Sequence, residues 1–463
     1  MANQIFTVTD LGGGDGGKGG VVHKICLQKN AHTVLKVGGA QGSHGVRTAF
    51  GQLFNFSQFG CGTFEGIKTH ITELMVIEPY RLLDEAERLI NEWGIKNIFS
   101  YITVDENALC VTPFHTFASQ LRELARKDKP KGTVGVGIGE AKRDAELHSE
   151  LAIYAKDLLS PNLHDKLVAV WEQKIKDLAH IIENVSELFP ADIQIARENI
   201  EFFKNPNFIA RVVQEFNEMG RRVKIVDKEY FKKNILDVDG TIVVESSHGV
   251  LTDKYYGFHP HTTQLRTMPI RTIELLNECG YDGDIFKLGV TRAYQIRHGA
   301  GPMPTQSDEL LDKLLPGSSK NENRWQGKVR VGPLDFVALR YAVQACGGPE
   351  FFDGIALTWF DQIQLCGDWK ICDGYTGANN PQFFAPDGNI KVRHGNDLAQ
   401  LKHQEELGNL LNTVRPIITS YSGIQDMNQQ EAIQLCSEVF ESKLHVPVRL
   451  ISFGATEEKQ ICI

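Results

Sequence analysis

The glycine-rich run from 11 to 20, LGGGDGGKGG, is the sequence feature that most constrains how this chain can fold. It follows an apolar, strand-like run at 5–10 and precedes a helix-compatible run at 21–27. Glycine allows positive φ angles and a close approach of backbone N–H groups to an anion, and the helix that follows presents its positive N-terminal end. The run therefore predicts a phosphate-binding turn between a strand and a helix.

Two positions distinguish this loop from an ordinary P-loop. The spacing Gly12-x-x-x-x-Gly17-Lys18 matches, but Gly19 stands where a Ser or Thr hydroxyl would reach Mg²⁺. Asp15 places a carboxylate among the phosphate-binding amides, which indicates a metal ligand or a general base. A flexible glycine turn that binds nothing is the alternative interpretation.

Length and composition limit the class of protein. The chain has 463 residues, enough for two or three domains or for one large α/β enzyme, and its 42% hydrophobic and 23% charged residues are typical of a globular protein. A formal charge of −9 argues against a general nucleic-acid binder. Without a leader-like start or a long apolar run we expect a cytoplasmic protein with no membrane partner. The nine cysteines form no CxxC pair, which argues against a structural zinc site.

Strand-like and helix-like runs alternate along the whole chain, which predicts an α/β fold with a large, mostly parallel central sheet flanked by helices. We expect one elaborated domain over 1–463, with a helical insertion at about 145–220. The predicted strands cover 5–10, 32–37, 241–246, 284–297 and 354–361, a hairpin covers 52–71, and helices cover 79–93, 112–126, 397–411 and 428–444.

A second glycine-rich turn, GGAQGSHGV at 38–46, follows the strand predicted at 32–37. It places His44 at the same end of a parallel sheet as the first loop, where open α/β sheets bind ligands. A single histidine is more often structural, but one flanked by glycines at a strand end fits a structural and a catalytic role about equally.

Motifs spread along the chain, taken together, carry a resemblance to a known family. They are GDGGKGG (14–20), GGAQGSHGV (38–46), GTVGVGIG (132–139), VVESSHGVLTD (243–253), GAGPMPT (299–305), GPLDFVALRYAV (332–343), LTWFD (357–361) and ISFGAT (451–456). In this order they resemble the adenylosuccinate synthetase family over essentially the full length. The resemblance implies a P-loop-like fold and a homodimer. It also implies a GTP-dependent ligase that uses Mg²⁺, activates the 6-oxo group of inosine 5′-monophosphate (IMP) and joins aspartate to it.

The resemblance also assigns roles to residues. It makes Asp15 the general base and a Mg²⁺ ligand, with Ser43 as a second metal-binding residue. It makes His44 the acid or electrostatic stabiliser that faces the transferred phosphoryl group. The residues expected to bind GTP are Gly14, Gly16, Gly17, Lys18 and Gly19 at the phosphates, and Thr358, Asp361 and Gly454 near the base.

The substrate side departs from the family pattern. The expected substrate-binding residues are Gln41, Gly42, Val134, His148, His248, Thr263, His298, Lys328 and Arg330. Val134 and His148 stand where the family holds the acceptor phosphate with Thr and Arg, and valine cannot donate a hydrogen bond. Two weakened anchors would cost about two to four powers of ten in affinity. An ordinary synthetase with shifted contacts, the same chemistry on a modified or deoxy purine nucleotide or nucleoside-type intermediate, and a non-catalytic GTP-binding regulator all remain open.

Overall fold

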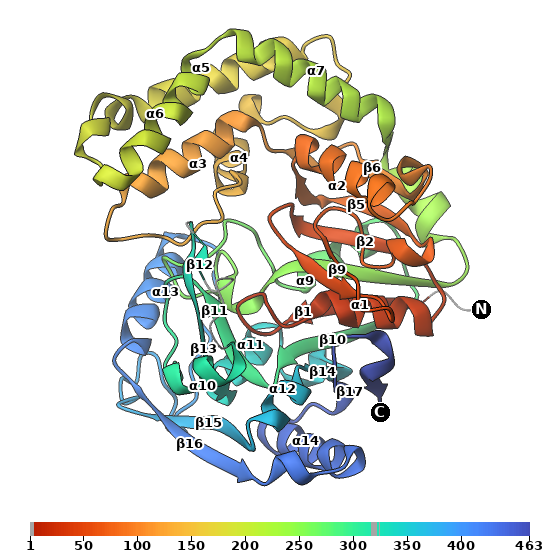
Figure 1. Ribbon diagram of the computed structural model, residues 1–463, viewed down its shortest axis with the longest axis vertical. Helices are drawn as coiled ribbons and strands as arrows, with labels where there is room; N and C mark the ends of the chain where they lie inside the picture. Colours follow the sequence, from red (N-terminus) through yellow and green to blue (C-terminus); the bar gives the residue numbers. More distant parts are fainter. Residues whose placement is uncertain (1–3, 316–321, 324) are drawn as a thin grey trace.

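Strand β1 (Gln4–Asp10) lies inside the larger sheet and is buried along most of its length. The parallel strands β10 (Asp284–Arg292) and β9 (Thr241–Gly249) pair with it on either side. Burial on both faces is typical of a parallel sheet covered by helices. The computed structural model describes residues 4–315, 322–323 and 325–463 (Figure 1).

The larger sheet has the order β18-β17-β14-β10-β1-β9-β2-β5-β6-β8, and β7 pairs with β5. Among the described strands of this sheet, only the β17–β18 pair is antiparallel, so the predicted mostly parallel sheet is confirmed. The remaining bounds are β2 (Ala31–Gly39), β5 (Lys68–Ile77), β6 (Ile102–Asp105), β7 (Leu109–Cys110), β8 (Lys224–Val226), β14 (Gly354–Thr358), β17 (Val448–Ser452) and β18 (Gln460–Cys462).

A smaller sheet has the order β11-β13-β15-β16, with β12 paired to β13. Its strands are β11 (Tyr294–His298), β12 (Glu322–Asn323), β13 (Gly327–Asp335), β15 (Asp368–Thr376) and β16 (Arg415–Ser422). The single strand predicted at 284–297 is therefore wrong. The chain leaves the central sheet after Arg292 and enters the smaller sheet at Tyr294.

The hairpin predicted at 52–71 is also displaced. The structure forms it from β3 (His44–Arg47) and β4 (Leu53–Phe56), and β5 is a parallel strand of the central sheet. The alternating pattern of 52–71 covers both β4 and the start of β5, and only tertiary pairing separates the two.

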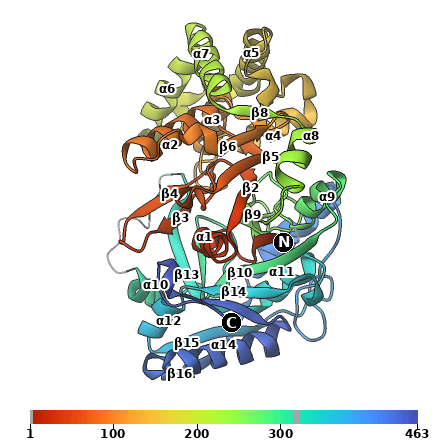
Figure 2. The same cartoon turned by 90° about the vertical axis from the view of Figure 1, so that its right-hand side faces the viewer.

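The helices are α1 (Lys18–Gln28), α2 (Pro79–Asn91), α3 (Pro113–Ala125), α4 (Ile138–Leu147), α5 (Leu163–Glu183), α6 (Pro190–Lys204), α7 (Asn207–Arg222), α8 (Lys228–Phe231), α9 (Ile270–Glu278), α10 (Asp308–Leu314), α11 (Phe336–Ala345), α12 (Phe360–Leu365), α13 (Leu398–Leu411) and α14 (Gln429–Leu444). Figures 1 and 2 show α5, α6 and α7 together at one end of the molecule, and β15, β16 and α14 at the opposite end. That residues 145–220 form an insertion within one domain stays a prediction.

Sequence signals explain where several helices begin. Proline, whose missing N–H costs nothing in the first turn, is the first residue of α2 and of α3. The Thr112 hydroxyl accepts a hydrogen bond from the backbone of His115 and caps α3. None of the described helices has both the length and the apolar character needed to cross a membrane.

Candidate active site

The glycine loop is organised by Asp10, the last residue of β1, which is buried. Its Oδ1 accepts a hydrogen bond from Gly12 N (2.8 Å), and its Oδ2 accepts from Gly16 N (2.7 Å) and from Lys18 Nζ (2.9 Å). A carboxylate between a strand and a glycine loop is a signal for such a role, but Asp10 is not among the predicted site residues. One side chain thus holds both ends of the loop.

Lys18 lies inside the loop. Its Nζ donates to the carbonyl of Gly14 (2.6 Å) as well as to Asp10. Gly17 precedes α1 with φ 87°, and a Cβ on Gly19 would come within 2.7 Å of the Gly45 carbonyl, so α1 packs closely against β3. Gly16, Gly17, Lys18 and Gly19 form the base of the loop, and their contact with GTP phosphates stays a prediction.

Asp15 lies at the tip of this loop with its side chain 41% exposed. Its Oδ2 is 3.5 Å from His298 Nε2, and its backbone carbonyl accepts a hydrogen bond from Arg292 Nε. The loop therefore presents a carboxylate that is open to solvent on the side that faces the cavity.

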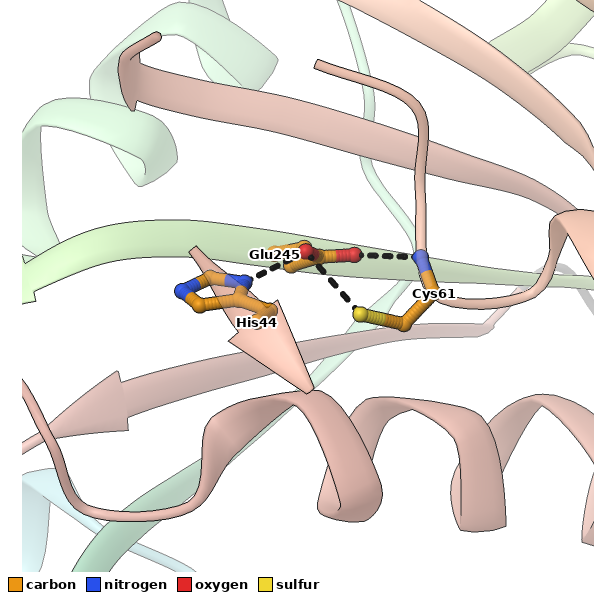
Figure 3. Close-up of side chains that lie close together, drawn as sticks. All are labelled: His44, Cys61 and Glu245. Atoms are coloured by element: carbon orange, nitrogen blue, oxygen red, sulfur yellow. Dashed lines mark hydrogen bonds and ion pairs between the residues drawn. The ribbon is translucent and has the colours of Figure 1, made fainter. Parts of the chain in front are cut away.

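His44 is held by a buried carboxylate, Glu245 of β9 (Figure 3). His44 Nδ1 lies 2.5 Å from Glu245 Oε1, and Lys36 Nζ donates to the same oxygen at 2.6 Å. Burial alone would raise the pKa of Glu245, but Lys36 and His44 outweigh it and hold this pKa well below its usual range. The ionised Glu245 thus orients the His44 ring and leaves its Nε2 pointing away, free to act on a ligand.

Cys61 completes this network. Its backbone N–H donates to Glu245 Oε2 (2.8 Å) and its thiol to Oε1 (3.3 Å). His44, Cys61 and Glu245 together offer a set of atoms that could hold a metal, but the ammonium of Lys36 already bonds the carboxylate, and burial raises the pKa of the Cys61 thiol well above its ordinary value. A thiol that keeps its proton is a poor metal ligand, so the cluster fits a hydrogen-bond network.

A cavity of about 460 Å³ lies at the carboxyl ends of β1, β2 and β9, and residues of α3, α4 and the turn after β11 complete its walls. Many predicted site residues meet here, from segments far apart in the sequence. Those that line it are Gly14, Asp15, Gln41, Gly42, Ser43, His44, Val134, His248, Thr263 and His298.

His248 lies near the end of β9, and it is unusual among the non-glycine residues of the cavity because its φ is 64°. Its Nε2 lies 2.6 Å from Gln41 Nε2, which donates to it. Burial, helped by the charge of Lys18, lowers the pKa of His248 to about 4. His248 is therefore a neutral ring in the cavity at neutral pH.

The residues predicted to bind the base of GTP lie on the other side of β1. Thr358 ends β14, Gly454 follows β17, and both strands lie across β1 from β9 and β2. The Thr358 hydroxyl donates to the carbonyl of Gly16 (2.6 Å) and so supports the glycine loop. Asp361 was expected at the end of a strand, but Trp359 with φ 60° turns the chain, and Asp361 lies in the first turn of α12.

Three predicted substrate-binding residues lie outside the cavity. His148 is exposed after the end of α4, and Lys328 is exposed on β13. Arg330 Nη2 donates to the carbonyls of Gly299 (2.6 Å) and Gly301 (2.8 Å) and holds that turn. Their predicted roles toward a substrate stay predictions.

The cavity also has basic residues that sequence analysis missed, Arg122, Arg126, Lys131, Arg143 and Arg297. Arg122 and Arg126 are spaced by four residues in the predicted helix at 112–126, which places them on one face of that helix. That spacing was the signal that could have revealed part of this group.

Comparisons with known proteins identify the family. The family model described as adenylosuccinate synthetase matches residues 8–461. The chain belongs to the adenylosuccinate synthetase family. An adenylosuccinate synthetase of Caldicellulosiruptor bescii is 28% identical over 80% of this chain and 81% of its own length. One from Thermoplasma volcanium is 23% identical over 100% of this chain and 98% of its own.

Solved structures share the fold. A fully ligated adenylosuccinate synthetase from Plasmodium falciparum has a TM-score of 0.72 at 17% identity and covers 99% of each chain. A succinoaminodeoxyadenylate synthetase from cyanophage S-2L, bound to dGMP and to dATP as an energy donor, has a TM-score of 0.54 at 14% identity, covering 100% of this chain and 96% of its own.

Adenylosuccinate synthetases are GTP-dependent ligases of purine biosynthesis that use Mg²⁺. The residues of this chain fit such an ion, because Mg²⁺ prefers oxygen ligands and both the Asp15 carboxylate and Ser43 line the cavity. Of the two predicted metal-binding residues, Asp15 would contribute a carboxylate oxygen and Ser43 a hydroxyl oxygen.

Proposed function

We propose that this protein is a GTP-dependent ligase that phosphorylates the 6-oxo group of IMP or an analogue and then joins L-aspartate to the purine. One observation carries the proposal. Asp15, in the glycine loop after β1, and His44, the first residue of β3 and a partner of Glu245, line one cavity. A base and a phosphoryl-facing donor placed together are what this two-step reaction requires.

The chain's own groups account for the steps. Asp15 takes the proton from N1 of the purine, so that O6 attacks the γ-phosphorus of GTP and the bond to the β–γ bridging oxygen breaks to release GDP. His44 faces the transferred phosphoryl group through Nε2 and stabilises its developing charge. Because Nδ1 donates to Glu245, Nε2 can donate to that group only when the ring carries a second proton. Burial lowers the pKa of His44, and the hydrogen bond to the Glu245 carboxylate opposes that effect. The amine of aspartate then attacks C6, and phosphate leaves with the O6 atom. Mg²⁺ held by Asp15 and Ser43 would neutralise charge on the phosphoryl oxygens.

A second candidate keeps this chemistry but changes the acceptor to a modified or deoxy purine nucleotide or a nucleoside-type intermediate. Val134 and the neutral His248 in the cavity favour it, since they stand where the family uses a Thr and a Gln to contact its ordinary acceptor. The cyanophage protein of the same fold is described as bound to dGMP and to dATP as an energy donor, which supports this candidate.

Purified protein incubated with GTP, Mg²⁺, aspartate and a panel of purine nucleotides and nucleosides tests these candidates. GDP and a succinylated product with IMP alone would support the first candidate, and turnover with another acceptor would support the second. GTP binding without GDP formation for any acceptor would contradict both and indicate a non-catalytic regulator.

Replacing Val134 by threonine is expected to lower KM for IMP by about tenfold, because a hydroxyl can donate to a phosphate that valine cannot bond. Steady-state kinetics with IMP and with inosine would measure it, and only the phosphorylated acceptor should gain. Val134→Ala is the control, since it changes the volume without adding a donor. An unchanged KM for IMP would mean that no phosphate lies beside residue 134.

Replacing Asp361 by asparagine is expected to lower the preference for GTP over ATP, measured as the ratio of kcat/KM, by about 10- to 100-fold. A carboxylate accepts from both N1–H and the exocyclic amine of guanine, whereas an asparagine side chain offers one acceptor. Asp368→Asn, at the start of β15, is the control. Unchanged selectivity would show that another residue reads the base.

A further inference from the structure

One wall of the cavity is formed by four cations, which we call the cationic wall: Arg122, Arg126, Lys131 and Arg143. Arg122 lies on α3, Arg126 directly follows it, Lys131 lies in the loop that follows, and Arg143 lies on α4. All four come from this chain alone. None of them was predicted from the sequence.

The carboxylates nearby do not balance these charges. Glu140 pairs with both Arg122 (3.1 Å) and Arg143 (3.3 Å). Arg122 also lies 3.7 Å from Asp177, a carboxylate that it shares with Lys174. Glu123 pairs with Arg126 (2.6 Å). Among the residues that the structure describes, no carboxylate lies within ion-pair distance of Lys131. The wall therefore keeps a surplus of positive charge toward the cavity.

A buried network fixes the helices that carry the wall. Lys174 of α5 is 0% exposed, and its Nζ lies 2.6 Å from Asp144 and 3.5 Å from Glu140 of α4. His115 of α3 contacts the same Asp144 at 3.2 Å. Because α3, α4 and α5 are joined at this point, Glu140 is held in place, and with it the guanidinium groups of Arg122 and Arg143.

The loop that carries Lys131 is also pinned to α3. Glu123 Oε1 accepts from Gly132 N (2.8 Å), and the Thr116 hydroxyl donates to the carbonyl of Val136 (2.7 Å). Burial, together with the charges of Arg126 and Arg143, lowers the pKa of Lys131 to about 8. Cations held this close without a full set of carboxylates attract an anion.

We propose that Arg126, Lys131 and Arg143 form an oxyanion subsite that binds a phosphate monoester or a carboxylate of a substrate in the cavity. This subsite supplies the positive charge that Val134 and the outlying His148 do not bring to the cavity. The proposal rests on the proposed function, since it takes the ligand to be the acceptor nucleotide or the amino-acid amine donor. Both present the same chemistry, an oxyanion that guanidinium and ammonium groups bind.

Kinetics of Lys131→Ala and Arg126→Ala distinguish the two sources. Each variant is expected to raise KM for one substrate by about 10- to 100-fold, because a charge-assisted hydrogen bond is lost. A higher KM for the acceptor assigns the subsite to its phosphate, and a higher KM for the amine assigns it to a carboxylate. Lys129→Ala, an exposed lysine of the same loop, is the matched control. Unchanged KM values for both substrates in both variants would overturn the proposal.

Chemical labelling gives a readout that needs no turnover. At pH 8 an acylating reagent is expected to modify Lys131 faster than Lys129 or Lys127, as measured by peptide mass spectrometry, and inorganic phosphate or succinate should slow the labelling of Lys131 alone. If neither anion protects Lys131, the subsite does not exist. The wild-type protein could form no GDP with any acceptor while an anion still protects Lys131. That result would refute the proposed function but would support the anion-binding subsite.

Discussion

Asp15→Asn is expected to lower kcat by about 10²- to 10⁴-fold, the usual contribution of a general base, while GTP still binds. Asparagine keeps the size of the side chain but cannot take a proton from the purine. The loop itself should survive, because Asp10 and not Asp15 holds Gly12, Gly16 and Lys18. The loss should therefore appear in turnover and not in folding.

Single-turnover GDP formation and calorimetric titration with GTP would separate these effects. Asp239→Asn, an exposed carboxylate far along the chain, is the control and should keep full activity. Full activity of Asp15→Asn would remove Asp15 from the role of base, and a loss of GTP binding equal to the loss of turnover would assign it to nucleotide binding alone.

Glu245→Leu is expected to lower the free energy of unfolding by about 3–5 kcal/mol, the usual effect of leaving one partner of a buried ion pair uncompensated. Glu245 is 0% exposed, and among the described residues it is the one carboxylate within ion-pair distance of Lys36. His44 would lose its partner in the same variant, so kcat should fall as well.

Urea unfolding followed by tryptophan fluorescence would measure the stability change. The double variant Lys36→Met/Glu245→Leu should recover most of the lost stability but not the activity, because it removes the stranded charge without restoring the His44 contact. Glu92→Ala breaks an exposed pair with Arg88 and should cost about 0.5 kcal/mol or less. A Glu245→Leu protein as stable as the parent would contradict a charged Lys36–Glu245 pair.

Much of the fold could be predicted from local sequence patterns. The apolar run at 5–10 is β1, the run at 241–246 lies within β9, and the glycine loop lies between a strand and a helix as predicted. The predicted strands were wrong where one continuous apolar pattern covers two separate elements. Residues 284–297 divide between two sheets at Ala293, and residues 52–71 divide between β4 and β5. Periodicity cannot show which sheet a strand joins.

Residues of the candidate site could be predicted from the sequence where their neighbours in the chain form a recognisable motif. Asp15 and His44 are marked by the glycines around them, and the structure brings both to one cavity. Asp10 and part of the cationic wall had local signals, in the position of Asp10 between a strand and the glycine loop and in the four-residue spacing of Arg122 and Arg126. Glu245 had no such signal, because its partners His44 and Lys36 are distant in the sequence. In the sequence, Glu245 is an ordinary residue of a predicted strand, and only the folded chain shows its hydrogen bond with His44.

The sequence by itself determined the glycine loop, the strands that carry it and the family, since glycine conformation, apolar periodicity and motif order are properties of neighbouring residues. The tertiary structure decided how the site is charged. Glu245 reaches His44 across 201 positions and Lys36 across 209, and the cationic wall forms only where α3, α4 and the loop at 126–137 meet at the cavity. A pKa and a surplus of charge depend on what lies nearby in space, so only the folded chain sets them.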